Sequence, residues 1–196
     1  MFKHTFNSTI LRSYDIRGIY DKTLTAEDAF MLGFFFGTTL RRKNPKKKHP
    51  LIIIGMDGRL SSPLLEEKLN EGLKISGCEI YRIGLGPTPM LYFASNYYKA
   101  DGAIQVTGSH NPKDYNGFKM VLNQNSFFGE DIKKLGELSK KGHSQTYRGF
   151  SKHITIDDKY IERIIKPIKS INEKLVNKTI VWDCGNGATG PLIKAI

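Results

Sequence analysis

Short apolar runs alternate with segments of helical spacing along this chain. Residues 51–54 are continuously apolar and β-branched, which is typical of a strand buried on both faces. Strands and helices that alternate in this way indicate an α/β protein with a largely parallel sheet covered on both faces. Further strands are predicted at 79–83, 103–107 and 118–122, and helices at 26–40, 63–76, 89–98 and 130–141.

Local signals mark where two of these helices begin. Thr25 followed by Asp28 matches a capping box, in which both side chains bond the first turn. Ser62 is predicted as the N-cap of the next helix, because Pro63 then takes the first helical position. The glycines within the first helix, among them Gly33, each weaken it by about 1 kcal/mol relative to alanine. We expect them to allow close packing on the sheet.

The strands at 103–107 and 118–122 are joined by about a dozen residues that contain no predicted helix. Such a short connection favours antiparallel pairing, which makes the predicted sheet mixed. Residues 143–149 are polar and form a candidate domain boundary. Beyond them, a helix at 157–166 and a strand at 178–183 are expected to belong to a second unit with too few residues to bury a core. An exposed strand edge there would favour self-association.

The composition is that of a soluble globular chain. Of its 196 residues, 39% are hydrophobic and 25% are charged. The longest apolar stretches are too short to span a bilayer, and the N-terminus lacks the apolar core of a secretory signal. We therefore expect a cytoplasmic protein without a membrane partner. Cys78 and Cys184 are too few for a disulfide framework or a zinc site, so both are predicted to be small buried side chains.

The formal net charge of +11 raises nucleic-acid binding as an alternative, because much positive charge falls within residues 41–49. Such binding also uses a groove-reading helix or stacking aromatic side chains close to the charge. The sequence beside this run offers neither, so we interpret it as a solvated loop and expect no nucleic-acid partner. A positive field favours the approach of an anionic sugar phosphate.

Ser109 lies in a polar loop, TGSHNP, that begins at the end of the predicted strand at 103–107. A hydroxyl, an imidazole and an amide (Ser109, His110 and Asn111) therefore share one loop at the carboxyl end of a strand, where ligands collect in α/β sheets. Lys119 adds a cation further along. This arrangement suits the handling of a phosphate. The alternative is a plain turn in which Ser109 and Asn111 bond their own backbone.

Residues 107–119, TGSHNPKDYNGFK, resemble the phosphoserine loop of the α-D-phosphohexomutases, the phosphomannomutase/phosphoglucomutase superfamily. The similarity extends in order and spacing over nearly the whole chain. YDIRG at 14–18 resembles the family's N-terminal signature, and GMDGR at 55–59 and GLGPTP at 84–89 resemble its next two strand-end loops. VWDCGNGA at 181–188 resembles the start of its second domain.

The resemblance implies a fold and an extent. Residues 1–150 are expected to form domain 1, an α/β/α sandwich around a four-stranded mixed sheet that carries the phosphoserine loop. Residues 151–196 are expected to be a linker and an incomplete beginning of domain 2. Family members have four domains, so the metal-binding, sugar-recognition and phosphate-clamping loops of later domains are expected to be missing from this sequence. The chain by itself is therefore predicted to be inactive as a mutase.

The resemblance also implies a reaction, the exchange of phosphate between the 1- and 6-hydroxyls of mannose or glucose phosphates through a 1,6-bisphosphate. Ser109 would carry the phosphoryl group, and its phosphate oxygen would be one ligand of Mg²⁺, with domain-2 aspartates absent from this chain as the others. Lys119 would manage the sugar hydroxyl proton, for which burial or a nearby charge must favour its neutral form. His110 is the alternative proton carrier, or only stiffens the loop. Asn111 would orient the loop, and residues 113–115 are interpreted as loop surface.

Residues of the other two signatures are expected near the site. Tyr14 and Arg17 are implied to line the substrate cleft, with Arg17 as a fixed positive partner of the phosphate. Asp57 and Arg59 lie at a strand end and fit a structural ion pair as well as a site element. Which hexose is preferred is left open.

Other classes of function stay open as alternatives. A non-catalytic binding or assembly module needs no complete catalytic set. A serine hydrolase is suggested by Ser109 beside His110, although adjacent side chains are expected to point apart and no G-x-S-x-G elbow occurs. Residues 185–190 match G-x-G-x-x-G after a predicted strand, the context of dinucleotide binding. The acidic residue that would support this reading, about 20 positions on, would lie beyond Ile196.

Overall fold

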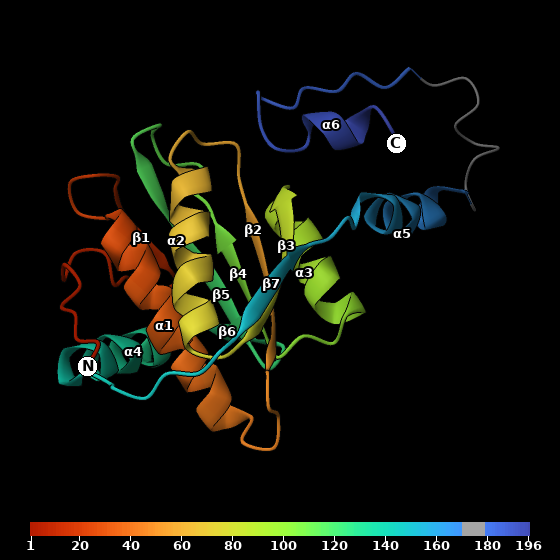
Figure 1. Cartoon of the computed structure of the whole chain (residues 1–196). Coiled ribbons are helices and arrows are strands. Elements are labelled where there is room, and N and C mark those ends of the chain that lie inside the picture. The colour runs from red at the N-terminus through yellow and green to blue at the C-terminus, as the bar shows by residue number, and fades with distance from the viewer. Residues whose placement is uncertain (170–178) are drawn as a thin grey trace.

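The computed structural model describes residues 1–169 and 179–196, and its centre is a mixed sheet (Figure 1). The strands are β1 (Ile16–Ile19), β2 (Leu51–Met56), β3 (Glu79–Leu85), β4 (Gly102–Val106), β5 (Tyr115–Leu122), β6 (Asn125–Phe127) and β7 (Phe150–His153). Their order is β1-β5-β4-β2-β3-β7, with β6 paired to β5. β2, β3, β4 and β7 run parallel, whereas β5 is antiparallel to β4, β1 and β6.

The mixed α/β architecture expected from the sequence is confirmed, and the number of strands is corrected. The four strands predicted within residues 1–150 all form, and β4 and β5 pair antiparallel as their short connection predicts. The sheet has seven strands rather than four. The additional strands β1, β6 and β7 have four, three and four residues. Runs this short do not display the alternation from which a strand is recognised in a sequence.

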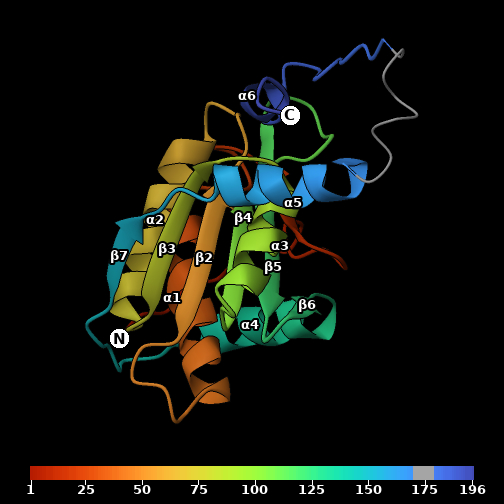
Figure 2. The ribbon, with the colours of Figure 1, turned by 90° about the vertical axis from the view of Figure 1, so that its right-hand side faces the viewer.

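Helices cover both faces of this sheet (Figures 1 and 2). One face carries α1 (Ala26–Lys43), α2 (Ser62–Ile75) and α4 (Glu130–Lys141), and the other carries α3 (Thr88–Tyr97) and α5 (Asp157–Lys169). The short helix α6 (Gly190–Ile193) follows near the end of the chain. In β2, Ile54 packs into the core under α1 and α2, and its neighbour Ile53 packs into the core under α3. β2 is therefore buried on both faces, as its continuous apolar run predicts.

The contact between α1 and α2 depends on glycines. The capping box at Thr25 is present, so α1 begins where the sequence predicts. A Cβ atom at Gly33 would lie 2.3 Å from the carbonyl oxygen of Leu69, and one at Gly72 would lie 2.0 Å from that of Phe30. The expectation that the glycines of α1 allow close packing on the sheet is therefore wrong for Gly33. It allows the backbones of two helices to approach each other instead.

The predicted N-cap of α2 is also corrected. The helix begins at Ser62 itself, and Ser61 occupies the cap position without a side-chain capping bond. The hydroxyl of Ser62 instead donates to a carboxylate oxygen of Asp57, at 2.6 Å. A hydroxyl caps a helix by accepting from first-turn amides, and it does so from the residue just before the helix, whereas Ser62 is already the first helical residue. The side chain thereby ties the start of α2 to the loop after β2.

Cys78 is fully buried beside α1, as predicted, whereas Cys184 is partly exposed, so the expectation that both cysteines are buried is wrong for Cys184. Burial raises the pKa of Cys78 to about 11, opposed in part by a hydrogen bond with Ser76. At pH 8, therefore, only about one in a thousand Cys78 side chains is in the reactive thiolate form. We expect iodoacetamide at pH 8 to add one adduct quickly, on Cys184, and a second only after denaturation, as counted by intact mass. Equal rates for the two cysteines would contradict the burial of Cys78.

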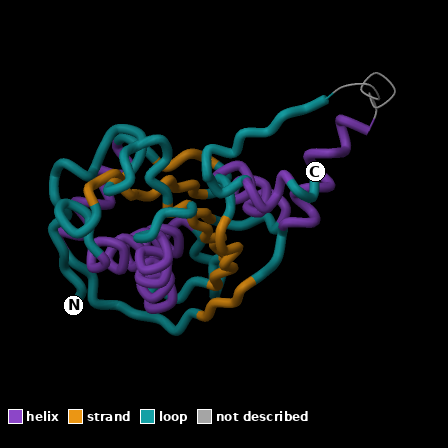
Figure 3. The backbone as a smooth tube through the Cα atoms, turned by 90° about the horizontal axis from the view of Figure 1, so that it is seen from above, coloured by secondary structure: helices purple, strands orange, loops and turns teal. Residues whose placement is uncertain are grey.

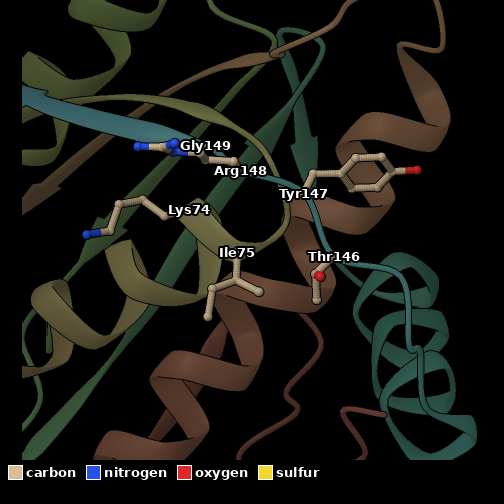
Figure 4. A pocket seen from close by; sticks show the side chains of 6 residues that line it. All are labelled: Lys74, Ile75, Thr146, Tyr147, Arg148 and Gly149. Atoms are coloured by element: carbon tan, nitrogen blue, oxygen red, sulfur yellow. The ribbon is translucent and has the colours of Figure 1, made fainter.

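The polar segment 143–149 passes the C-terminal end of α2 before it reaches β7. The amides of Tyr147 and Gly149 donate to the carbonyls of Ile75 and Lys74, each at 2.8 Å. Figure 4 shows the hollow of about 480 Å³ at this place, where the side chains of Tyr147 and Arg148 point in opposite directions. β7 then joins the edge of the sheet beside β3. The division of the chain near residue 150 stays a prediction.

The strand expected at 178–183 is not formed by its described part. Residue 178 lies outside the described residues, and residues 179–183 run as a loop (Figure 3). Ile180, Val181 and Trp182 are 60%, 89% and 57% exposed. An apolar run forms a strand only when another strand pairs with it, and within residues 1–169 and 179–196 none does so here.

The basic run 41–49 covers the last turn of α1 and the loop that leads to β2, so it is only partly the loop expected, and most of its side chains are exposed. Two of its cations have partners. The guanidinium of Arg41 stacks on the ring of Tyr147 at 3.7 Å, and the ammonium of Lys47 pairs with Asp101 at 2.6 Å. In the part of the chain that the structure describes, no helix is both long enough and apolar enough to cross a membrane.

Candidate functional site

A cavity of about 1130 Å³ opens at the carboxyl ends of β2, β3 and β4. The loops after these three strands line it, together with residues 185–189 from the far end of the chain. Figure 1 places that segment and α6 beyond this edge of the sheet. The position agrees with the general rule for ligand sites in α/β sheets. Of the site residues predicted from the sequence, Ser109 and Asn111 line the cavity, whereas Tyr14, Arg17, His110 and Lys119 do not.

The loop after β4 presents Ser109 in a left-handed turn. Its φ is +54°, its amide donates to the hydroxyl of Thr107 at 2.8 Å, and its own side chain is exposed. The amide of Asn111 and its side-chain amide both donate to the carbonyl of Gly108, each at 3.1 Å. The loop is therefore closed on itself below an accessible hydroxyl.

The side chain of His110 lies beside that hydroxyl. Its Nδ1 is 3.3 Å from Ser109 Oγ, so the expectation that these adjacent side chains point apart is wrong. The tight turn at Ser109 accounts for their approach. Among the described residues, no third group bonds the imidazole of His110. A nucleophile and a base without an orienting partner do not make the triad of a serine hydrolase.

Arg59, from the loop after β2, binds the underside of the Ser109 loop. Its Nη1 donates to the carbonyls of Pro112 and Tyr115, at 2.5 and 2.9 Å. Its Nη2 donates to those of Ser109 and Asn111, at 3.1 and 2.6 Å. Four backbone oxygens of one loop thus converge on a single guanidinium.

Asp57 completes this arrangement. One carboxylate oxygen accepts from the amide of Gly108 at 2.9 Å and lies 3.3 Å from Arg59 Nε. The other accepts from the hydroxyl of Ser62 and from the amide of Arg59. From the sequence, Asp57 and Arg59 could be interpreted either as a structural ion pair or as part of the site. They form an ion pair, and that pair supports the Ser109 loop.

Arg17 is buried below the same loop, whereas Tyr14 is 84% exposed. The guanidinium of Arg17 donates to the carbonyl of Thr107 and to the carboxylate of Asp15, both at 2.5 Å. Its side chain is only 2% exposed. Arg17 therefore fixes the point at which β4 ends and the Ser109 loop begins.

Gln105 is a site residue that the sequence reasoning did not single out. It lines the cavity, is 1% exposed, and donates from Nε2 to the carbonyl of Gly86 at 2.9 Å. Its Oε1 has no hydrogen-bond partner among the described residues. A polar residue inside the otherwise apolar run of β4 was the available signal. Lys119 pairs with Gln105 in register, so their side chains share one face of the sheet.

Two loop residues that were interpreted as surface lie at the cavity as well. Lys113 and Asp114 are exposed, as expected, and both line it. Residues 185–190 form a turn that leads into α6, but no strand precedes them in the described residues. The G-x-G-x-x-G match therefore lacks the strand that dinucleotide binding requires.

The described residues do not form a complete metal site. No group of three or more His, Cys, Asp and Glu side chains suited to a metal occurs within residues 1–169 and 179–196. The carboxylate of Asp57, which contacts the Ser109 loop directly, is already occupied by four donors. A phosphate on Ser109 would offer oxygens to a cation, but these side chains would not complete its shell.

Known proteins match this chain across the loops described above. Residues 8–146 match the family model described as phosphoglucomutase/phosphomannomutase, alpha/beta/alpha domain I. A phosphomannomutase/phosphoglucomutase of Pseudomonas syringae is 41% identical over 93% of this chain and 37% of its own length. One from Pseudomonas aeruginosa is 36% identical over 95% of this chain and 38% of its own. The chain thus spans less than two fifths of the length of these curated relatives.

Solved structures agree with this assignment. A phosphoglucomutase/phosphomannomutase family protein from Burkholderia thailandensis superposes with a TM-score of 0.80 at 34% identity, covering 95% of this chain and 41% of that one. A second solved structure, from Thermus thermophilus, shares the fold of this chain. Its TM-score is 0.70 at 23% identity, and the match covers 83% of this chain and 37% of that one. The match of sequence, fold and loop positions means that this chain belongs to the phosphoglucomutase/phosphomannomutase family and contains its domain I.

Proposed function

We propose that Ser109 accepts a phosphoryl group from a hexose 1,6-bisphosphate and returns it to a hexose monophosphate of the mannose or glucose series. The observation that carries the proposal is the position of Ser109 Oγ, exposed on a fixed loop at the mouth of the cavity. Family membership supports the class of substrate, because the relatives are named for these two sugars. In a protein of the relatives' full length, this half-reaction would form part of the interconversion of hexose 1- and 6-phosphates.

The transfer is balanced within the two reactants. A bond forms between Ser109 Oγ and phosphorus, and the bond between phosphorus and one sugar oxygen breaks. The serine hydroxyl proton passes to that sugar oxygen, and the reverse step returns the phosphoryl group to the other hydroxyl. Phosphate esters cleave so slowly unaided that the barrier must fall by roughly 20 kcal/mol, mostly through positioning and charge neutralisation. Fixing the Ser109 loop serves the first requirement.

Cations near the loop serve the second requirement. A phosphate on Ser109 adds about −1.5 to −2 charges at neutral pH. We assign part of the compensation to the fixed guanidinium of Arg17 and to Lys119. Tyr14 is assigned to sugar contact and Asn111 to loop orientation. Lys119 or His110 carries the proton, and of these His110 lies within hydrogen-bonding reach of Ser109 Oγ.

Mg²⁺ is proposed as the cofactor, with an oxygen of the Ser109 phosphate as one ligand. When bound, the ion would neutralise charge on the transferring group. The described side chains do not supply its other ligands.

The test is a single-turnover assay with glucose 1,6-bisphosphate and, in parallel, mannose 1,6-bisphosphate. We expect each chain to release about one equivalent of hexose monophosphate and then stop, because the serine is then phosphorylated. The Ser109→Ala variant should release none. Equal release by this variant would remove Ser109 from the reaction. A Ser109-dependent burst with a p-nitrophenyl ester, without sugar phosphate release, would favour a hydrolase instead.

A further inference from the structure

We propose that Arg59 is a positioning residue for phosphoryl transfer, which holds the Ser109 loop in place without binding substrate. This inference rests on the proposed function of Ser109. It assigns to Arg59 a role in addition to its ion pair with Asp57, which is to hold the Ser109 loop in place.

A guanidinium carries five N–H groups, and in Arg59 four of them form hydrogen bonds while the fifth lies in an ion pair. Four donate to carbonyl oxygens of residues 109, 111, 112 and 115, and the fifth, on Nε, faces Asp57. The side chain is 15% exposed. Arg59 therefore lines the cavity with both Nη atoms fully bonded to loop carbonyls and its Nε paired with Asp57, so its Nη donors are not available to a phosphate or a sugar hydroxyl.

The arrangement requires arginine rather than a positive charge in general. A lysine ammonium has three donors on one atom and cannot reach four carbonyls spread along a loop. The carboxylate of Asp57 fixes the guanidinium from the other side and also accepts from the amide of Gly108. The same ion pair therefore binds the loop at its start and along its length.

Gly108 provides an independent observation. A Cβ atom at this position would lie 1.9 Å from Arg59 Nε and 2.1 Å from Arg59 Cζ. The φ angle of Gly108 lies outside the left-handed region, so its backbone is open to alanine. Glycine is needed at residue 108 because Arg59 occupies the space, and not because of the local turn.

Positioning has a characteristic kinetic consequence. A displacement of about 1 Å in a reacting group costs about 100-fold in rate. We therefore expect Arg59→Ala and Arg59→Lys to lower the single-turnover rate of phosphoryl transfer to Ser109 by about 100-fold. The bisphosphate concentration that gives half the maximal rate should change by less than about threefold, because no substrate contact is lost. Added guanidinium ion should restore part of the rate to Arg59→Ala and none to Arg59→Lys, in which the side chain still fills the site.

Hydrogen exchange tests the loop without any substrate. We expect the amides of residues 108–115 to exchange faster in Arg59→Ala than in the wild type, while the amides of β2 and β4 stay protected. Arg42→Ala is the matched control, because Arg42 is exposed and has no side-chain partner among the described residues. It should leave both exchange and transfer unchanged.

A double-variant cycle makes the assignment specific. Gly108→Ala should slow transfer and loosen the loop in the wild-type background, because the new methyl group displaces Arg59. In the Arg59→Ala background the same substitution should have little further effect. Additive effects of the two substitutions would overturn the proposed contact, even if either variant is less stable.

The outcomes separate this inference from the proposed function. Unchanged loop exchange in Arg59→Ala, or a raised half-saturation concentration with an unchanged maximal rate, would overturn the positioning role. If the wild-type chain transfers no phosphate while Arg59→Ala still loosens the loop, the proposed function fails and the loop contact stands. If Arg59→Ala does not fold, Arg59→Lys and Gly108→Ala carry the same measurements.

Discussion

An Asp15→Ala variant is expected to lose about 3 kcal/mol of unfolding free energy, out of the roughly 5–15 kcal/mol typical of a domain. The reason is the guanidinium of Arg17, which is 2% exposed and has Asp15 as its ionic partner. Removing the carboxylate leaves a buried charge with the carbonyl of Thr107 as its remaining partner. Asp15 itself is 18% exposed, so water entering the gap limits the loss to the lower end of the usual range.

Urea denaturation measures this loss. Glu137→Ala, which removes an exposed carboxylate without a partner in the described part of the chain, should change stability by no more than about 0.5 kcal/mol. Adding Arg17→Met to Asp15→Ala should recover part of the stability, because removing both members of a buried pair costs less than removing one. A double variant less stable than Asp15→Ala would contradict this description of the pair.

A Lys119→Ala variant is expected to transfer the phosphoryl group between Ser109 and the sugar about 10²–10⁴-fold more slowly, the usual contribution of a positioned proton carrier. Lys119 lies on β5 opposite Gln105, which lines the cavity, and its ammonium has no ion pair among the described residues. The variant should therefore lose transfer without a large loss of stability.

Quenched-flow measurement of sugar phosphate release, with denaturation of the same samples, distinguishes these effects. Lys46→Ala is the matched control, because it removes an equal charge from the exposed basic loop. Transfer at the wild-type rate in Lys119→Ala would assign the proton to His110 instead. A drop shared by Lys46→Ala would indicate a general effect of net charge.

Much of the fold was predictable because its local signals are strong. β2 follows from a continuous β-branched run, and α1 begins at a capping box that the sequence displays. The strand expected at 178–183 also contains an apolar run, at residues 180–182, yet residues 179–183 form no strand. Strand formation depends on a neighbour, and the sequence of one segment does not reveal whether a neighbour is present. β1, β6 and β7 were missed for the converse reason, since pairing creates strands too short to be recognised alone.

Some residues of the cavity were predictable from the sequence, but their contacts were not. Ser109, Asn111, Asp57 and Arg59 are all visible as polar residues at strand ends. The convergence of four loop carbonyls on Arg59 is a tertiary event between segments about 50 residues apart, with no local trace. The hydroxyl of Ser62 illustrates the same limit. Its sequence context predicts a helix cap, but the helix begins one residue earlier than expected and the hydroxyl bonds Asp57 in the preceding loop.

Peptide mapping by tandem mass spectrometry, after incubation of the wild-type chain with glucose 1,6-bisphosphate, tests the central claim most directly. The account predicts a single phosphate per chain, located on Ser109, and no phosphate on the Ser109→Ala protein. A phosphate found on any other residue, or the same phosphate mass gained by Ser109→Ala, would contradict it.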